Sequence, residues 1–305
     1  MVKEKIKFIM AFMIIILFLP YICVILLHSN VQAEDTFFIT ADKEGDTDVE
    51  VFVAGVLATQ ISANSEMEML KAQAVIARTQ IYKMMKEKGI TNLEAKHLSQ
   101  YMSMSEMEKI WGYHKMQEYY RKFKQAADET RGIVMKYQGQ YIEPSYHAVS
   151  NGHSRNGNQV YHSEYYPYLV TVENPYDILS ENYLRVIMLD KKFMAEKLAA
   201  VLGEEKLSED MMTKLEIVEQ DEAGYVTKIK VGEHIMAGEE FRKVLELNSA
   251  CFELEEVDKK IRITTKGLGH GIGLSQFNGN EMAKNKEGYQ SILSYYFKNI
   301  EFVSE

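Results

Sequence analysis

Residues 65–89 have the hydrophobic pattern of a helix with one packed face. Ser65, with Glu68 three residues later, predicts a capping box at the start of this helix, and Gly89 predicts its end. The apolar positions recur at intervals of three or four residues: Leu70, Ala74, Ala77 and Ile81. The chain before this helix, residues 49–61, is compatible with a helical or a mixed structure.

A long apolar run near the N-terminus predicts a membrane anchor. The run covers residues 8–27, and twenty helical residues span about 30 Å, the thickness of a bilayer core. Lysines precede the run and none follows it directly, which predicts that residues 1–7 are a cytoplasmic tail and that the rest lies outside the cytoplasm. The small residues of Val31–Ala33 support a second interpretation, a signal peptide cleaved near Ala33 and a secreted protein.

The rest of the chain mixes helical and strand patterns. Residues 28–48 read as a polar linker, and residues 49–305 as a single extracytoplasmic domain. Because no regular alternation of strand and helix is present, we expect an α+β fold with mixed helices and antiparallel strands. The expected helices cover 94–130, 190–203 and two stretches that begin near Ser275 and Ser291. The expected strands are a hairpin that turns at Gln138 and Gly139, and segments within 224–235 and 259–267.

The amino-acid composition and the net charge argue against several functional classes of protein. The chain has 305 residues, of which 46% are hydrophobic, enough for a sizeable core. The net charge of −9 argues against non-specific binding of nucleic acid. Cys23 and Cys251 are the two cysteines, and Cys23 lies in the apolar run, so a disulfide framework and a cysteine-rich zinc site are excluded.

Two cations interrupt the alanine-rich helix, Lys71 and Arg78. They are one heptad apart and therefore share a helical face. Exposed cations whose stems cover apolar neighbours would explain them. The small residues around them favour close packing by another element instead, where a cation needs an anionic or hydrogen-bonding partner. The residues alone leave both interpretations open.

Two loop regions carry candidate chemistry. In GLGHGIGLSQ, residues 267–276, four alternating glycines flank His270 and permit the close approach of a ligand or of another chain segment. A tight loop with a structural histidine is the alternative. His147, His153 and His162 share a Gly- and Asn-rich region and could hold zinc, although no carboxylate or thiol has a persuasive spacing.

These motifs closely resemble the stage II sporulation protein D family, also called the sporulation/amidase-enhancer domain family. LKAQAVIARTQ, residues 70–80, and the Gly-rich motif that continues to Phe297 occur in the family's order. PSYHAVSNGHSRNG, residues 144–157, is similar to its middle motif, and FRKVLELNSACFEL, residues 241–254, to its penultimate one. The resemblance covers about residues 49–302.

The resemblance implies a peptidoglycan lytic transglycosylase that cleaves denuded glycan strands during engulfment and leaves 1,6-anhydro ends. It also implies the partners, an amidase and a polytopic membrane protein, and a place in the mother-cell membrane facing the septal wall. The reaction needs one carboxylic acid that protonates the glycosidic oxygen and then serves as base. No cofactor is required. Some relatives hold zinc near the middle motif with Cys and His, whereas this chain has Ser150 there and no Cys.

Gln60 is the one departure at a position that the chemistry needs. The family's acid is a Glu eleven residues before the Lys of the helix motif, and that count from Lys71 leads to Gln60. An amide has the shape of a carboxyl group but cannot transfer the proton, and general acid–base catalysis contributes about a hundred- to ten-thousand-fold.

The remaining site residues are carried over by motif. Lys71 and Arg78 join Gln60 as candidate catalytic positions, and both are expected to bind glycan carboxylates or to orient residue 60. The candidate substrate-binding residues are Gln73, Ser145, Tyr146, His147, His270, Ser275 and Gln276. Three hypotheses follow. The first is an active enzyme in which another acid, such as Glu66 or Glu68, replaces position 60, and the second is a catalytically impaired relative that binds glycan or acts as a scaffold. The third, a membrane-anchored adaptor with no glycan contact, would not explain why the motifs are retained.

Overall fold

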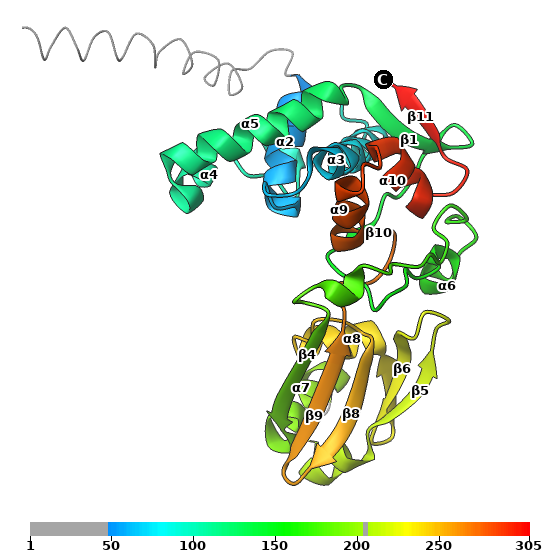
Figure 1. Cartoon of the computed structure of the whole chain (residues 1–305). Helices are drawn as coiled ribbons and strands as arrows, with labels where there is room; N and C mark the ends of the chain where they lie inside the picture. The colour runs from blue at the N-terminus through cyan, green and yellow to red at the C-terminus, as the bar shows by residue number, and fades with distance from the viewer. Residues whose placement is uncertain (1–47, 204–206) are drawn as a thin grey trace, which may run out of the picture. The chain divides into compact units, whose positions relative to one another are not determined.

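The structure is a computed structural model that describes residues 48–203 and 207–305 (Figure 1). The predicted tail 1–7, the anchor 8–27, the cleavage site near Ala33 and nearly all of the linker lie outside the described residues. Within the described ranges, no helix has both the length and the apolar character needed to cross a membrane. The anchor and its alternative therefore stay predictions.

The chain forms mixed helices and strands, as expected for an α+β fold. Its contacts divide it into two units, Met1–Val51 and Phe52–Glu305. The helices are α2 Val49–Gln60, α3 Met67–Lys88, α4 Met104–Trp111, α5 Tyr113–Glu129, α6 Gly157–Tyr161, α7 Lys191–Leu202, α8 Gly238–Val244, α9 Gln276–Lys284 and α10 Tyr289–Tyr296. Short 3₁₀ helices are η2 Ala95–His97, η3 Asp177–Leu179 and η4 Glu209–Lys214.

The strands form small sheets that are mostly antiparallel. Their order is β11-β1-β2, β4-β9-β8 and β5-β6-β7, and β3 with β10 makes a two-stranded parallel pair. The strands are β1 Ile133–Tyr137, β2 Gln140–Tyr141, β3 Tyr146–His147, β4 Leu184–Asp190, β5 Glu216–Gln220, β6 Val226–Val231, β7 His234–Ala237, β8 Phe252–Val257, β9 Lys260–Lys266, β10 Leu274–Ser275 and β11 Glu301–Ser304. The expected α+β class with antiparallel strands is confirmed.

One hydrophobic core is built around α3. Met69, Val75 and Ile76 of this helix are completely buried and belong to a cluster with residues of β1, β10 and α10. Helix α3 also contacts α5, α9 and β1, and Figure 1 shows α10 next to it on the side of β1. A second cluster fills the space among α7, α8 and the strands β4 to β9. The helix motif of α3 and the last motif, which carries β10 and α10, therefore meet in the first core, whereas the penultimate motif belongs to the second.

Local predictions for α3 and the hairpin had different outcomes. The predicted capping box is wrong, because the N-cap of α3 is Glu66 and makes no side-chain cap bond. The carboxylate of Glu68 instead accepts the Tyr289 N–H at 2.9 Å. Gly89 does end the helix, in the left-handed conformation with φ 64°. The hairpin turn is confirmed, because residues 138 and 139 have φ values of 49° and 73°.

Lys71 and Arg78 do share a face of α3, and this face is turned to the C-terminal end of α5. Lys71 Nζ lies 2.7 Å from a carboxylate oxygen of Glu129 and 2.7 Å from one of Glu68. Its side chain is only 16% exposed. The predicted close packing around the cations is therefore present, and the partner element is part of the same chain.

Arg78 is completely buried. Its guanidinium donates to the carbonyl oxygens of Ala127 at 3.0 Å and Ile133 at 3.1 Å, and to the hydroxyl of Thr130 at 3.3 Å. These acceptors belong to the end of α5 and the start of β1, where helix carbonyls have no partner within the helix. The expectation that Arg78 faces a glycan cleft is corrected: it joins α3 to the α5–β1 corner from inside.

We expect Arg78→Met to lower the free energy of unfolding by about 2–4 kcal/mol, because buried carbonyl and hydroxyl groups lose their donor. Equilibrium unfolding in urea measures this difference. Arg121→Met is the matched control, since Arg121 is exposed on α5, and it should change stability by less than about 0.5 kcal/mol. Equal stability of the two variants would contradict the structural role of Arg78.

Candidate functional site

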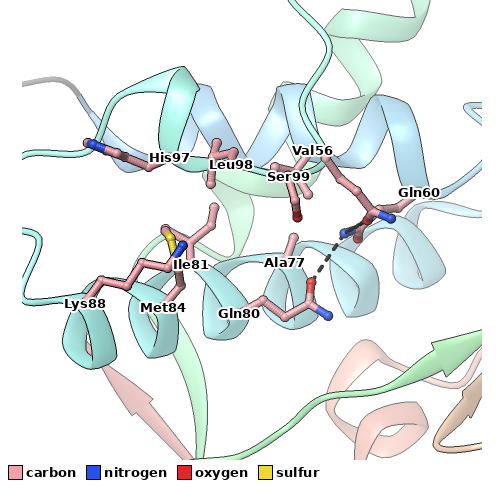
Figure 2. A pocket seen from close by; sticks show the side chains of 11 residues that line it. Val56, Gln60, Ala77, Gln80, Ile81, Met84, Lys88, His97, Leu98 and Ser99 are labelled. Carbon is pink, nitrogen blue, oxygen red and sulfur yellow. Dashed lines mark hydrogen bonds between the residues drawn. The ribbon is translucent and has the colours of Figure 1, made fainter.

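Gln60 is the last residue of α2 and lies among other glutamines. Gln73 of α3 donates from Nε2 to Gln60 Oε1 at 2.9 Å. Gln60 Nε2 in turn donates to Gln80 Oε1 at 3.3 Å and to Gln100 Oε1 at 3.2 Å. Figure 2 shows the amide of Gln60 turned toward that of Gln80. Position 60 is thus held by amides that come from two turns of one helix and from a loop.

Gln276, at the start of α9, completes this cluster. Its Nε2 donates to the backbone carbonyl of Gln60 at 2.8 Å and to Gln73 Oε1 at 3.2 Å. The Gln60 carbonyl is at the C-terminal end of α2, so Gln276 satisfies an acceptor that the helix leaves open. Tyr146 donates from its hydroxyl to Gln100 Oε1 at 3.4 Å. We call Gln60, Gln73, Gln80, Gln100 and Gln276 the glutamine cluster.

A pocket of about 140 Å³ lies beside Gln60 (Figure 2). Its titratable side chains are those of Lys88 and His97, and among the described residues no aspartate or glutamate lines it. The full lining is Val56, Gln60, Ala77, Gln80, Ile81, Met84, Lys88, His97, Leu98, Ser99 and Gln100. The pocket therefore offers amide and hydroxyl hydrogen bonds next to apolar surface, without a carboxyl group.

This arrangement suits binding better than proton transfer. A primary amide donates and accepts hydrogen bonds but does not titrate, so the glutamine cluster can hold neutral hydroxyl or acetamido groups. General acid catalysis needs a group whose pKa is close to the working pH and which lies within hydrogen-bonding reach of the reacting atom. No carboxyl group of the described pocket lining provides this.

The Gly-rich segment, residues 267–276, packs against another segment of the same chain. Gly267, Gly269, Gly271 and Gly273 all have positive φ. A Cβ on Gly273 would lie 2.0 Å from the Ser145 carbonyl oxygen. The glycines thus let the last motif lie against the middle motif, as in the parallel pair of β10 with β3. The sequence allowed the close approach of a ligand or of another chain segment at these glycines, and the structure shows the approach of a chain segment.

His147 and His270 lie inside this contact. Burial, with a smaller contribution from His270, lowers the pKa of His147 to about 3, and burial also lowers the pKa of His270. His147 Nδ1 is 3.1 Å from the Ile272 carbonyl oxygen, and the two rings are 6.0 Å apart. His270 Nδ1 accepts the Ile272 N–H at 3.1 Å. Both rings are neutral and hold the two motifs together, which does not support their assignment to substrate binding.

Ser275 and Ser145 are also buried. The Ser275 hydroxyl donates to the carboxylate of Asp177 at 2.8 Å and accepts the Asn278 N–H as the N-cap of α9. Asp177 further accepts the hydroxyl of Ser150 at 2.6 Å, and burial raises the pKa of Asp177. The Ser145 hydroxyl is 3.4 Å from that of Tyr161. The expected contact of Ser275 with substrate is therefore corrected, because its hydroxyl is committed to an interior network.

The zinc candidates do not gather into a ligand set. In the described parts of the chain, no group of three or more His, Cys, Asp or Glu side chains is placed to hold a metal ion. His153 is exposed, whereas His147 is 3% exposed with Nδ1 on a carbonyl. Position 150 contributes a serine bound to Asp177. The described residues thus do not fit the zinc site that the resemblance raised.

Two members of the glutamine cluster, Gln80 and Gln100, were not predicted. Gln80 lies one heptad after Gln73, so the helical pattern contained a signal for it. Gln100 comes from the loop before α4, and nothing in the local pattern places it beside residue 60. Of the predicted residues, the structure brings together Gln60, Gln73, Gln276 and Tyr146.

The neutral His147 predicts a dependence of stability on pH. The unfolded state binds its proton near pH 6.5 and the folded state only near pH 3, so the unfolded state binds more protons between these values. We expect the free energy of unfolding to fall by up to about 1.4 kcal/mol per pH unit below pH 6.5.

Urea unfolding at about pH 7 and about pH 5 tests this slope. The slope should be smaller in His147→Gln and unchanged in His153→Gln, whose side chain is exposed. A slope that His147→Gln leaves intact would contradict a neutral, buried His147.

Comparisons with known proteins agree with the motifs. A sequence profile described as Stage II sporulation protein matches residues 41–137. The chain is 32% identical to stage II sporulation protein D of Bacillus subtilis, over 82% of this chain and 73% of that protein. It is 30% identical to stage II sporulation protein D of Bacillus amyloliquefaciens, over 83% and 73%. It is 24% identical to the amidase enhancer of Bacillus subtilis, over 80% of this chain and 39% of that protein.

Proposed function

Because the chain belongs to the stage II sporulation protein D family, we propose that it binds glycan strands of peptidoglycan during sporulation and has lost most of the cleavage activity. The proposal has two parts, a retained binding site and a missing proton donor. Each part rests on the surroundings of Gln60.

The missing proton donor is supported by the pocket beside Gln60, whose described lining contains no carboxyl group. The two acids considered as substitutes have other roles: Glu66 is the exposed N-cap residue of α3, and Glu68 pairs with Lys71 and accepts the Tyr289 N–H. A lytic transglycosylase must protonate the glycosidic oxygen and then remove the proton of the C6 hydroxyl. An amide at position 60 performs neither step.

Retained binding is supported by the hydrogen-bonding capacity of the glutamine cluster. Glycan strands carry hydroxyl and acetamido groups, which both donate and accept, as amides do. Gln60, Gln80 and Gln100 line the pocket, and the buried Gln73 and half-buried Gln276 hold Gln60 in place before a ligand arrives. Ordered polar groups in a partly apolar pocket are a common basis for specific recognition.

The second candidate is an active lytic transglycosylase. What speaks for it is the setting of position 60 rather than the residue there: a carboxylic acid would face Oε1 of Gln80 and of Gln100, the acceptors of the present amide N–H. Such acceptors stabilise the protonated form of an acid and favour a general acid. The surroundings are thus suited to the family's Glu, and the residue that would use them is replaced.

The location and partners follow from the same proposal. The family resemblance supports a place outside the cytoplasm, anchored by residues 8–27 or released near Ala33. It also supports an assembly with a cell-wall amidase and a polytopic membrane protein, and one relative is named an amidase enhancer. A scaffold that presents denuded strands to an amidase complex needs glycan binding but no cleavage and no cofactor.

We expect Gln60→Glu in the full-length chain to produce anhydro ends on amidase-treated sacculi, at least a hundredfold more than the unchanged chain. The carboxyl group would supply the proton transfers that the amide lacks. Mass spectrometry of the released fragments measures these ends, and co-sedimentation with the same sacculi measures binding.

Ser99→Glu is the matched control, because it adds the same group to the same pocket at a position outside the glutamine cluster. This variant should bind glycan and stay inactive. Abundant anhydro ends from the unchanged chain would contradict the loss of activity, and absence of binding by every form would contradict a glycan site.

A further inference from the structure

A second, larger pocket lies beside the β1–β2 hairpin. Its volume is about 590 Å³, and the hairpin and residues 164–168 form most of its wall. We propose that this tyrosine pocket is a second glycan subsite, which binds sugar rings of the same strand that occupies the Gln60 site; this rests on the proposed function. Its lining residues are Lys83, Tyr137, Gln138, Gln140, Tyr141, Ile142, Glu164, Tyr165, Tyr166, Pro167 and Tyr168.

Five of these residues are tyrosines, and several of their rings are packed in fixed positions. The rings of Tyr166 and Tyr161 are 4.4 Å apart, and those of Tyr137 and Tyr168 are 5.6 Å apart. The Tyr168 hydroxyl accepts the Glu143 N–H at 2.8 Å. By contrast, Tyr165 is 87% exposed. The pocket thus combines a preformed aromatic wall with one large aromatic side chain exposed to solvent.

The composition of the wall suits a carbohydrate. A sugar ring has an apolar face of C–H groups and a polar edge of hydroxyls, and tyrosine has an apolar ring with a polar tip. The amides of Gln138 and Gln140 and the carboxylate of Glu164 provide hydrogen bonds around the rings. Pockets that join aromatic walls to a few polar groups are typical of small-ligand sites.

The charged side chains at the tyrosine pocket favour a ligand that is uncharged or weakly acidic. Lys83, which lines the pocket, pairs with Glu143. Lys86 lies 5.8 Å from the centre of the Tyr141 ring and donates to the Gln140 amide at 2.8 Å. An exposed lysine with an amide partner is suited to pair with the lactyl carboxylate of a muramic acid. A highly charged ligand would meet both signs in this region.

The chain connects this pocket directly to the Gln60 site. Ile142 lines the tyrosine pocket, and Glu143 pairs with Lys83. The next carbonyl, of Pro144, is 3.5 Å from Nε2 of Gln80, a member of the glutamine cluster.

Helix α3 also joins the two pockets, because Gln80 lines the pocket beside Gln60 and Lys83 lines the tyrosine pocket. These two residues are three positions apart, a rise of about 4.5 Å along the helix axis. Tyr146, four residues after Ile142, donates to Gln100. Residues 142–146 therefore lead from one pocket to the other along α3, and a polymer with repeated sugar rings can occupy both.

If one glycan strand occupies both subsites of the protein, its affinity should depend on its length. Once one subsite is occupied, the second binds an already tethered segment, which raises the overall affinity. A short oligosaccharide that reaches only one subsite loses this gain. A stem peptide, which lacks sugar rings, should not compete for the tyrosine pocket.

The test compares the affinity of the full-length chain and its variants for denuded glycan strands separated by length. Tyr165→Ala should bind long strands about three- to tenfold more weakly, and disaccharides as tightly as the unchanged chain. Tyr165→Phe should keep most of the affinity, because the ring is retained. Tyr113→Ala is the matched control, a tyrosine that is 39% exposed on α5.

The outcomes separate this proposal from the proposed function. Equal binding of long strands by Tyr165→Ala and the unchanged chain would overturn the second subsite alone. Competition by free stem peptide that Tyr165→Ala abolishes would overturn the assignment to carbohydrate. Failure of the unchanged chain to bind any glycan would overturn the proposed function, and the subsite with it.

Discussion

The hydrogen bonds from Gln73 and Gln276 to Gln60 are the interactions on which the candidate site depends. They join the end of α2, the middle of α3 and the start of α9, which are separated by up to 216 residues of sequence. The opposite side of α3 is fixed by Arg78, whose buried guanidinium binds the α5–β1 corner. The helix that carries two members of the glutamine cluster is thereby anchored on two sides, and position 60 is held in a defined environment.

In the proposed function, a single atom of residue 60, nitrogen in place of oxygen, separates binding from catalysis. In Gln60 one terminal atom accepts from Gln73 and the other donates to Gln80 and Gln100. A protonated carboxylic acid could accept from Gln73 in the same way, but its single O–H could donate to only one of Gln80 and Gln100. The substitution therefore keeps the shape of the side chain and its acceptor bond, and removes the titratable proton.

The sequence predicted the elements whose signals are local. Apolar spacing and Gly89 placed α3, paired turn residues placed the hairpin, and Ser275 placed the start of α9. Local signals failed for residue types that occur both buried and exposed to solvent or to a ligand. Arg78 and Lys71 could have faced solvent, and His147 and Ser275 could have faced a ligand; their burial depends on elements distant in sequence, α5 and the Gly-rich segment. Gln100 was missed for the same reason, whereas Gln73 and Gln276 were found because family motifs contain them.

The central claim is that the chain binds denuded strands and leaves them whole. The most direct measurement is the length distribution of purified denuded glycan strands after incubation with the full-length chain, with the bound fraction determined in the same sample. We expect the strands to be bound and their lengths to stay unchanged. Strands shortened to fragments with anhydro ends would contradict this expectation, because another residue of the chain would then supply the proton that Gln60 cannot.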